Sequence, residues 1–179
     1  MIIIDDLLPK QHRLKVVTQL TEQLPITWRK WGDKTSNPVE DFCVYVWKQV
    51  FPKYVVMNSE GWEYWEQRFG PSETQDYIGF HTDNDLDRWV DPEEEQKLID
   101  SGRVKTADYG FIYYAHTEPC VGGYLEIKRD NEELERIQPV PNRLILFTPN
   151  AQHRVTNVVK GYRRSIVSNL WKQTPNKYK

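Results

Sequence analysis

The spacing of apolar residues in the first third of the chain predicts two short strands with a helix between them. Residues 1–4 read "MIII", an apolar run typical of a strand, and "ITWRKWG" at 26–32 indicates a second strand. Between them, residues 9–24 place apolar side chains at the spacing of an amphipathic helix: Leu14, Val17, Leu20 and Leu24.

A second helix is predicted over "NPVEDFCVYVWKQVFP" because this segment carries a helix start signal. Asn37 is the N-cap, Pro38 takes the first helical position, and Glu40 takes the third. Pro52 ends the helix, since proline lacks the backbone donor that the next turn needs. We expect the two helices to form one layer packed on a sheet.

From residue 61 onward the pattern changes to short aromatic and β-branched runs separated by turn residues. These runs are "GWEYWEQRFG", "YIGFHTD", "YGFIYYAHT", "GGYLEIKRD", "NRLILFTP", "HRVTNVV" and "YRRSIVSNLW". Their repetition is typical of a β-sandwich or barrel. Residues 91–102, "DPEEEQKLIDSG", interrupt them with an N-cap at Asp91 and Gly102 beyond the end, which predicts a short inserted helix.

Composition narrows the class of protein without changing this picture. The 179 residues suffice for one domain with a sizeable core, and an aromatic content of 13% argues against disorder. The net charge of −2 gives no general attraction to nucleic acid or to an anionic membrane. The first residues do not resemble a signal peptide, no apolar run has membrane-spanning length, and Cys43 and Cys120 form no disulfide framework. We therefore expect a cytoplasmic protein.

The stretch "GFHTDND" at 79–85 supplies the first candidate chemistry. His81 and Asp83 are two residues apart, so on a strand both side chains point to the same face. His153 lies downstream, where a turn leads into the strand "HRVTNVV". Two histidines and one carboxylate on a β scaffold form the facial ligand set of non-haem Fe(II) oxygenases.

A candidate anion-binding arginine follows His153. The turn at residues 160–161 predicts a hairpin in which His153 pairs near residue 167. Arg163 then lies about four residues nearer the turn, roughly 13 Å from the position opposite His153 at ~3.3 Å per residue. The guanidinium suits a carboxylate because its planar fork binds both oxygens. A five-carbon dicarboxylate held at the metal could span this interval, and Ser165, which faces the same way as Arg163, could donate a hydroxyl to it.

Together, these pieces resemble the prolyl 4-hydroxylase branch of the 2-oxoglutarate/Fe(II)-dependent dioxygenases over residues 60–171. The matching motifs agree in order and spacing: "HTD" (81–83), "FIYYA" and "GGYLEI" (111–127), "NRLILF" (142–147), "HRVTNV" (153–158) and "GYRRSI" (161–166). The resemblance implies an α+β, mainly β fold, namely a double-stranded β-helix (a cupin-like jelly roll) with N-terminal helices packed on one sheet. It implies a single domain over 1–179, in which 1–60 support the sheet and 61–171 form the core with its helical insert near 91–102.

The resemblance also assigns roles to individual residues. The implied iron ligands are His81, Asp83 and His153. The implied ligands of the far carboxylate of 2-oxoglutarate are Arg163 and Tyr114, to which strand alternation adds Ser165 as a further donor. Because neighbours on a strand face opposite ways, only one of Tyr113 and Tyr114 points inward. The family often has an aromatic residue where this chain has Asn169, and the candidates for a substrate pocket are Asn169 and Trp171.

The implied reaction hydroxylates an unactivated C–H bond with Fe(II), 2-oxoglutarate and O₂, with ascorbate as a candidate auxiliary, and releases succinate and CO₂. The implied substrate is a prolyl residue of a peptide or protein, and neither nucleic acid nor a membrane is an expected partner. Three alternatives stay open: hydroxylation of another amino-acid side chain or of a free amino acid, a cupin-like zinc hydrolase, and a non-catalytic binding module. The acidic insert at 84–107 is either a solvated segment or a lid over the active site.

Overall fold

Antiparallel strands form three sheets in the computed structural model, which describes residues 1–18, 23–51, 53–71, 79–86, 90–129 and 133–179. In that part of the chain, the major sheet has the order β1-β8-β4-β11-β3-β2, the minor sheet has the order β7-β6-β9, and β10 pairs with β5. The strands are β1 (Ile2–Ile4), β2 (Thr27–Lys30), β3 (Gly61–Phe69), β4 (Tyr109–Tyr114), β5 (Val121–Gly122), β6 (Leu125–Lys128), β7 (Leu134–Ile137), β8 (Leu144–Phe147), β9 (His153–Val155), β10 (Val158–Lys160) and β11 (Arg163–Trp171).

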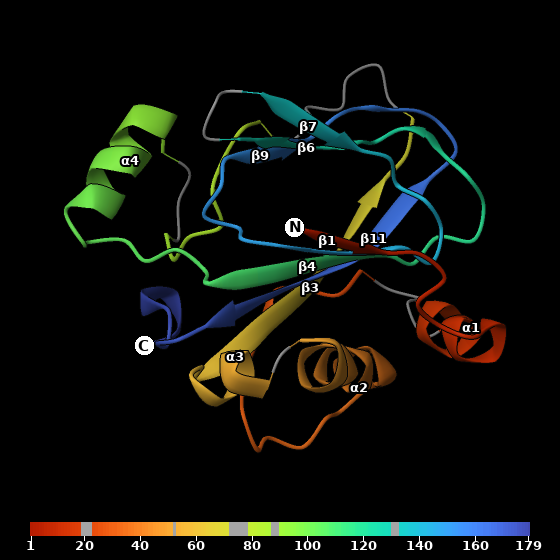
Figure 1. Ribbon diagram of the computed structural model, residues 1–179, viewed down its shortest axis with the longest axis horizontal. Coiled ribbons are helices and arrows are strands. Elements are labelled where there is room, and N and C mark those ends of the chain that lie inside the picture. The colour runs from red at the N-terminus through yellow and green to blue at the C-terminus, as the bar shows by residue number, and fades with distance from the viewer. Residues whose placement is uncertain (19–22, 52, 72–78, 87–89, 130–132) are drawn as a thin grey trace.

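Helices and the minor sheet cover opposite faces of the major sheet (Figure 1). Figure 1 shows the minor sheet above the major sheet, with α1 (Lys10–Thr18), α2 (Pro38–Tyr45) and α3 (Lys53–Met57) below it. A π-helical turn, η1 (Val46–Val50), continues α2. The inserted helix α4 (Pro92–Asp100) and the 3₁₀ turn η2 (Asn176–Tyr178) lie at the same end of the sheets. The mainly β jelly roll with helices packed on one sheet, predicted from the sequence, is confirmed.

Strand β11 lies near the middle of the major sheet, and its side chains alternate between the two faces of that sheet. It pairs with β3 over its whole length and with β4 from Ser165 to Leu170. Val167 packs in the core between the two sheets, whereas Ile166 and Leu170 pack in the core on the helix side. Odd-numbered residues of β11 therefore face the interior of the jelly roll.

The predictions for the two N-terminal helices differ in how well they agree with the structure. In α2 the start signal is confirmed, because Asn37 Oδ1 accepts hydrogen bonds from the backbone N–H groups of Val39 and Glu40, each at 3.0 Å. In α1 the buried residue is Val16, while Leu14 is 45% exposed. The predicted apolar stripe of α1 is confirmed at Val17, which packs against the helix-side core, and is wrong at Leu14, because the apolar residues are spread around the helix. Leu24 packs against the same core beyond the end of α1, and Leu20 lies outside the described residues.

The hairpin predicted around residues 160–161 is wrong. His153 of β9 lies opposite Ile127 of β6, and β10 pairs with β5. After a turn at Gly161, whose φ is +79°, the chain crosses to the major sheet, so Val167 lies between β3 and β4 instead of opposite His153. A turn signal marks a change of direction, but it does not determine which strand becomes the neighbour.

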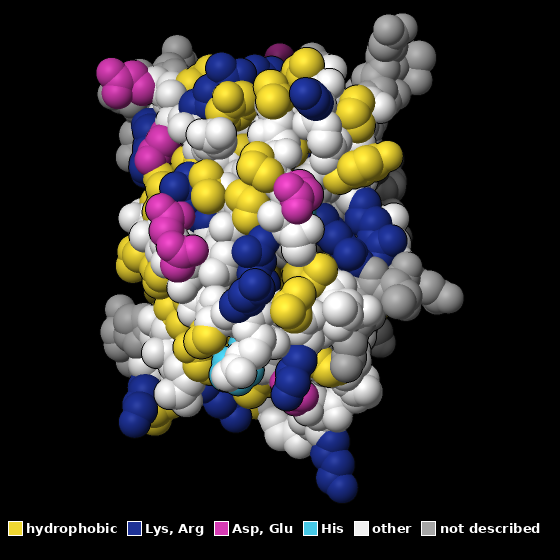
Figure 2. All heavy atoms as spheres, turned by 90° about the vertical axis from the view of Figure 1, so that its right-hand side faces the viewer, with side chains coloured by type: hydrophobic (Ala, Val, Ile, Leu, Met, Phe, Trp, Pro, Cys, Tyr) yellow, Lys and Arg dark blue, Asp and Glu magenta, His cyan; other side chains and the backbone are white. Residues whose placement is uncertain are grey.

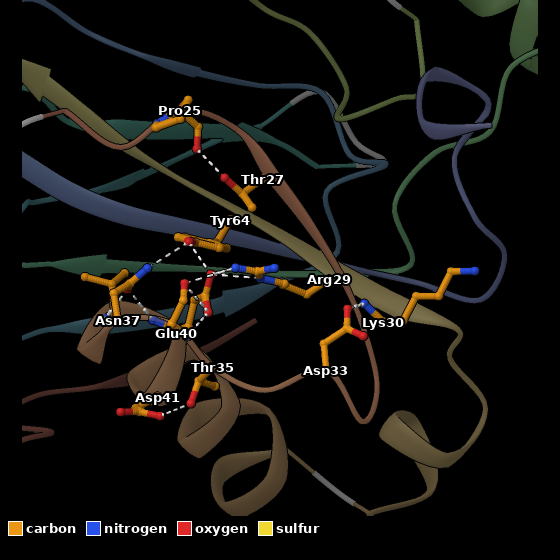
Figure 3. Close-up of polar contacts among 12 residues, drawn as sticks. Pro25, Thr27, Arg29, Lys30, Asp33, Thr35, Asn37, Glu40, Asp41 and Tyr64 are labelled. Atoms are coloured by element: carbon orange, nitrogen blue, oxygen red, sulfur yellow. Dashed lines mark hydrogen bonds and ion pairs between the residues drawn. The ribbon is translucent and has the colours of Figure 1, made fainter.

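A buried carboxylate ties α2 to the helix side of the major sheet (Figure 3). Glu40 is fully buried, and its oxygens accept hydrogen bonds from Arg29 Nε at 2.8 Å, Tyr64 Oη at 2.7 Å and the backbone N–H of Ser36 at 2.6 Å. Arg29 Nη2 also pairs with Glu40 and donates to Ser36 Oγ at 3.1 Å. The protein itself supplies the partners of both charges, so this cluster is a structural joint.

The surface at the α1 end of the molecule carries charges of both signs (Figure 2). Lys and Arg side chains stand there in separate groups, with hydrophobic and acidic side chains between them. Within the described ranges, no helix is long and apolar enough to cross a membrane. Cys43 and Cys120 are both buried as free thiols.

Candidate metal centre

Three metal-ligand candidates converge where the start of β9 meets the loop that contains residues 79–86. His81 and His153 form an isolated antiparallel bridge, in which each backbone N–H donates to the other's carbonyl, at 3.0 and 2.9 Å. Asp83 is fixed two residues further on, because its N–H donates to the carbonyl of Pro149 at 3.0 Å. One ligand atom from each of the three side chains lies within 4.8 Å of the others. The fold therefore brings together the three residues that the sequence grouped.

Backbone carbonyls set the orientation of both imidazoles. His81 Nδ1 lies 2.8 Å from the carbonyl oxygen of Gly79, and His153 Nδ1 lies 2.9 Å from that of Ala151. A carbonyl only accepts, so each Nδ1 carries the proton and donates it. Each Nε2 then faces Asp83 Oδ1, at 3.6 Å from His81 and 3.7 Å from His153. Such hydrogen bonds to the far ring nitrogen are how proteins orient metal-binding histidines.

Burial and charge act in opposite directions on this cluster. Burial lowers the pKa of His153 below its ordinary value, although Asp83 opposes the shift. Burial also lowers the pKa of His81, but the hydrogen bond and the charge of Asp83 raise it above its ordinary value. Burial raises the pKa of Asp83, but the two histidines together bring it below its ordinary value. An ionised Asp83 and a neutral His153 are the protonation states that metal binding requires.

Two further side chains hold this loop, and sequence reasoning missed both in that role. Asn169 Nδ2 donates to Asp83 Oδ2 at 3.1 Å from the interior face of β11. Glu95 of α4 is 5% exposed and accepts hydrogen bonds from Thr82 Oγ1 at 2.6 Å and from Asn84 Nδ2. Strand alternation could have placed Asn169 on this face, but no local pattern links Glu95 to the loop. Helix α4 is thus fastened beside the metal-ligand candidates.

A fully buried arginine lies on the same face of β11 as Asn169. Arg163 Nη1 donates to Ser165 Oγ at 3.0 Å and to Gln67 Oε1 at 3.4 Å. Its Nε and Nη2 meet no acceptor among the described residues, and the hydroxyl of Tyr114 likewise has no partner there. The guanidinium carbon lies 5.1 Å from the centre of the Tyr114 ring. These donors fit a carboxylate, whose two oxygens match the guanidinium fork.

The structure distinguishes the two candidate tyrosines. Tyr114 lies opposite Ser165 and faces Arg163, whereas Tyr113 lies on the helix side and donates its hydroxyl to Asn142 Oδ1 at 2.8 Å. Burial raises the pKa of the Tyr114 phenol, and the charge of Arg163 only partly opposes this. The phenol therefore keeps its proton and can donate it to an anion.

A glycine allows the turn between β5 and β6 to approach the arginine closely. Gly123 has a φ of +65°, and a Cβ there would lie 2.9 Å from Arg163 Cδ. Both the left-handed backbone and the close approach favour glycine at this position. The guanidinium is thus enclosed by β3, β4 and this turn.

The two residues predicted for a substrate pocket are both buried. Trp171 is 1% exposed, and its Nε1 donates to Glu63 Oε1 at 3.2 Å. Asn169 has no exposed surface and contacts Asp83. Their part in substrate binding stays a prediction.

The metal-ligand candidates and the buried arginine share one interior surface. On β11, Asn169 contacts Asp83, and Ser165 contacts Arg163. Between these two residues lies Val167, part of an apolar core cluster. Two imidazole nitrogens and a carboxylate fit a divalent metal, and the arginine fits the distant carboxylate of a ligand that reaches toward the triad. Such an arrangement suits a metal that works with a small bifunctional acid.

Comparisons with known proteins agree with this geometry. A family model described as the 2OG-Fe(II) oxygenase superfamily matches residues 67–171. That range includes His81, Asp83, His153 and Arg163. The sequence has no match among curated proteins.

Several solved structures share the fold at low sequence identity. A Pseudomonas putida prolyl-4-hydroxylase is 14% identical with a TM-score of 0.65, over 96% of this chain and 92% of that one. A prolyl hydroxylase from Trichoplax adhaerens, in complex with a peptide fragment of the hypoxia inducible factor oxygen degradation domain, is 16% identical with a TM-score of 0.57, over 96% and 83%. The 2OG complex of a viral collagen prolyl hydroxylase from Paramecium bursaria Chlorella virus-1 is 15% identical with a TM-score of 0.51, over 94% and 93%.

Proposed function

Because the chain belongs to the 2OG-Fe(II) oxygenase superfamily, we propose that it hydroxylates a prolyl residue of a peptide or protein, with release of succinate and CO₂. The family membership makes it an oxygenase that uses Fe(II), 2-oxoglutarate and O₂. It gives no support to the zinc-hydrolase alternative. The choice of a prolyl substrate, and the roles of individual residues, are our proposal.

One observation carries the assignment of the cosubstrate site. Arg163 is fully buried, yet two of its nitrogens have no acceptor among the described residues. A buried cation with no counter-charge among the described residues is costly to a fold, so its persistence favours a functional anion at that place. The nearby hydroxyls of Tyr114 and Ser165 add donors suited to the same carboxylate.

The residues of the chain hold and orient the reactants. In our proposal His81, Asp83 and His153 hold Fe(II), while Arg163 and Tyr114 bind the far carboxylate of 2-oxoglutarate and so fix its orientation. Bound Fe(II), with 2-oxoglutarate and O₂, supplies the oxidation of a C–H bond that no side chain can perform. The backbone carbonyls that receive the Nδ1 protons keep each imidazole turned toward Asp83.

The prolyl substrate is favoured by the structural neighbours. Three structures of similar fold come from prolyl hydroxylases, and one of those is in complex with a peptide fragment. At an identity this low these structures support the fold alone, so the substrate needs a direct test. Hydroxylation of another side chain or of a free amino acid is the alternative that the same chemistry permits.

The cosubstrate site is tested by visible spectroscopy without oxygen. Metal-free protein is mixed with Fe(II), then titrated with 2-oxoglutarate, and the metal-to-ligand charge-transfer absorption is followed. We expect absorption in the wild type, its loss in Asp83→Ala, and a much higher concentration requirement in Arg163→Ala. No absorption in the wild type at any concentration would contradict the assignment.

The substrate is tested with paired peptides that differ only by proline or alanine at one position. Mass spectrometry should find the mass of one added oxygen on the proline peptide alone, with succinate formed in equal amount. Asp83→Ala serves as the inactive control. Oxygen on a different side chain, or turnover only with a free amino acid, would replace the prolyl proposal with its alternative.

A further inference from the structure

A buried relay of polar groups connects the carboxylate of Asp83 to the turn η2. Asn169 Nδ2 donates to Asp83 Oδ2 at 3.1 Å and lies 3.5 Å from Glu63 Oε1. On its other side, Glu63 Oε2 accepts a hydrogen bond from Tyr178 Oη at 2.7 Å and pairs with Lys177 Nζ at 3.0 Å. The metal-ligand candidate and η2 are thus joined through two side chains that are each at most 2% exposed.

The orientation of the Asn169 amide follows from its neighbours. Its nitrogen faces two carboxylates, those of Asp83 and Glu63, which can only accept when ionised. Its oxygen has no donor among the described residues and faces the backbone of Gly110, where a Cβ would lie 2.8 Å away. A flipped amide would set an acceptor against an acceptor, so the donor remains directed at Asp83.

The charge of Glu63 makes η2 part of this arrangement. A buried carboxylate must be compensated, and Glu63 receives Lys177, the hydroxyl of Tyr178 and the indole N–H of Trp171. Without Lys177 and the Tyr178 hydroxyl, the Glu63 carboxylate would compete more strongly with Asp83 for the N–H groups of Asn169. The position of η2 therefore bears on how firmly Asn169 holds Asp83.

A second contact fixes η2 to the loop that carries the metal-ligand candidates. The backbone N–H of Asn176 donates to Asp85 Oδ2 at 3.0 Å, and Asp85 Oδ1 accepts from the N–H of Lys105 at 2.8 Å. Asp85 is buried and lies two residues after Asp83. The turn thus reaches the same loop by two routes, one through the backbone and one through the relay.

We propose that η2 is a positioning element of the metal centre, acting through Glu63 and Asn169 on Asp83. Asn169 occupies Asp83 Oδ2, so Oδ1, the oxygen that faces both imidazoles, is the one offered to the metal. Residues 176–178 lie outside the segment matched by the family model. The inference rests on the proposed metal site and needs neither 2-oxoglutarate nor a prolyl substrate.

The test is titration of the metal-free protein with Co(II), followed by its visible absorption. Asn169→Leu removes the donor to Asp83, and we expect metal binding about ten-fold weaker with a changed Co(II) spectrum. Tyr178→Phe keeps the stacking of this ring on Trp28, whose centres lie 5.4 Å apart, and removes only the hydroxyl. Combined with Lys177→Met, it should weaken Co(II) binding several-fold and change the spectrum in the same direction.

Lys172→Met is the matched control, because it removes a lysine from the same segment that pairs with Asp108 at the surface. It should leave Co(II) binding unchanged. Thermal unfolding of each metal-free variant shows whether it is folded, and Tyr178→Phe alone stands in if the double variant is not. Co(II) affinity and spectrum unchanged in the η2 variants would overturn the proposal. Failure of the peptide experiment with an intact Co(II) effect would overturn only the prolyl substrate.

Discussion

Two arginines on opposite faces of the major sheet are bound in contrasting ways. Arg29 faces the helices and finds both a charge partner and further acceptors within the protein, in Glu40 and Ser36. Arg163 faces the interior of the jelly roll and is fully buried, and among the described residues its hydrogen-bond acceptors are the neutral side chains of Ser165 and Gln67. The same kind of side chain thus has its partners within the fold in one place and, in our proposal, binds a ligand in the other.

The contrast teaches how to recognise a binding residue without a bound ligand. Burial alone does not distinguish a structural group from a functional one, since Glu40 is as buried as Arg163. The distinction lies in whether buried donors and acceptors are matched inside the protein. Matched clusters contribute to stability, while unmatched ones mark the places where a ligand completes the structure.

The largest expected effect comes from exchanging each arginine for methionine. Arg163→Met should weaken 2-oxoglutarate binding at least about 100-fold, or about 2.7 kcal/mol, because the anion loses its bidentate partner. Its stability without ligand should stay the same or rise, since a buried charge with no counter-charge among the described residues is removed. The measurements are the charge-transfer titration and urea unfolding.

Arg29→Met should give the reverse result. The carboxylate of Glu40 would stay buried without its charge partner, so we expect the free energy of unfolding to fall by about 3 kcal/mol. The affinity of the remaining folded protein for 2-oxoglutarate should be unchanged. If both variants lost affinity and stability alike, the division between the two sites would be wrong.

The neighbouring tyrosines allow a smaller and cleaner version of the same comparison. Tyr114→Phe removes a hydroxyl that has no partner among the described residues, so stability should hold while 2-oxoglutarate binds about ten-fold more weakly. Tyr113→Phe removes the donor to Asn142, and should cost about 1 kcal/mol of stability without altering affinity. Equal effects of the two variants on affinity would contradict the assignment of Tyr114.

Two glycines with the same backbone conformation sharpen the comparison further. Gly102 and Gly123 have φ values of +70° and +65°, so the backbone conformation alone should make alanine cost each position about 1 kcal/mol of stability. A Cβ at position 102 would meet nothing within 4 Å, whereas at 123 it would press on Arg163. Only Gly123→Ala should weaken 2-oxoglutarate binding, by about five-fold in the same titration.

The smallest expected effect is a dependence of stability on pH at the structural joint. Burial raises the pKa of Glu40, but hydrogen bonds from Tyr64, Ser36 and Arg29 bring it below the ordinary value of 4.5. Its stabilising contribution is therefore present above about pH 4.5 and is lost as the pH falls through the lower folded value. Urea unfolding at a series of acid pH values should show a shallower decline in Glu40→Gln than in the wild type. Parallel declines would show that Glu40 does not contribute to the acid sensitivity.

Local patterns in the sequence predicted those parts of the fold that local forces determine. The helix start signals at Asn37 and Asp91 were confirmed because an N-cap acts within three residues. The predictions of a buried Leu14 on α1 and of the partner of β9 were wrong, because both depend on contacts between segments far apart in the chain. Hydrophobic spacing carries little information about such partners.

The candidate site shows the same division. His81, Asp83 and His153 could be grouped from motif spacing, and the fold brings them together. Strand alternation showed that only one of Tyr113 and Tyr114 faces inward, but the choice needed the register of β4 against β11. The supports that we propose for Asp83, namely Asn169, Glu63 and η2, come from three separate elements, so no single motif contains them.

Strand β11 gives the site a fixed length. It pairs without a bulge with β3 from Arg163 to Trp171, and also with β4 through most of that range, so the strand cannot stretch or slip by itself. Asn169, which contacts Asp83, and Arg163, which we propose binds the acid, are therefore set at one spacing, roughly 20 Å between backbone positions at ~3.3 Å per residue. With the roles proposed for these residues, the strand fixes the distance between the metal ligands and the arginine, so we expect an oxoacid one carbon shorter or longer than 2-oxoglutarate to bind more weakly in the same titration.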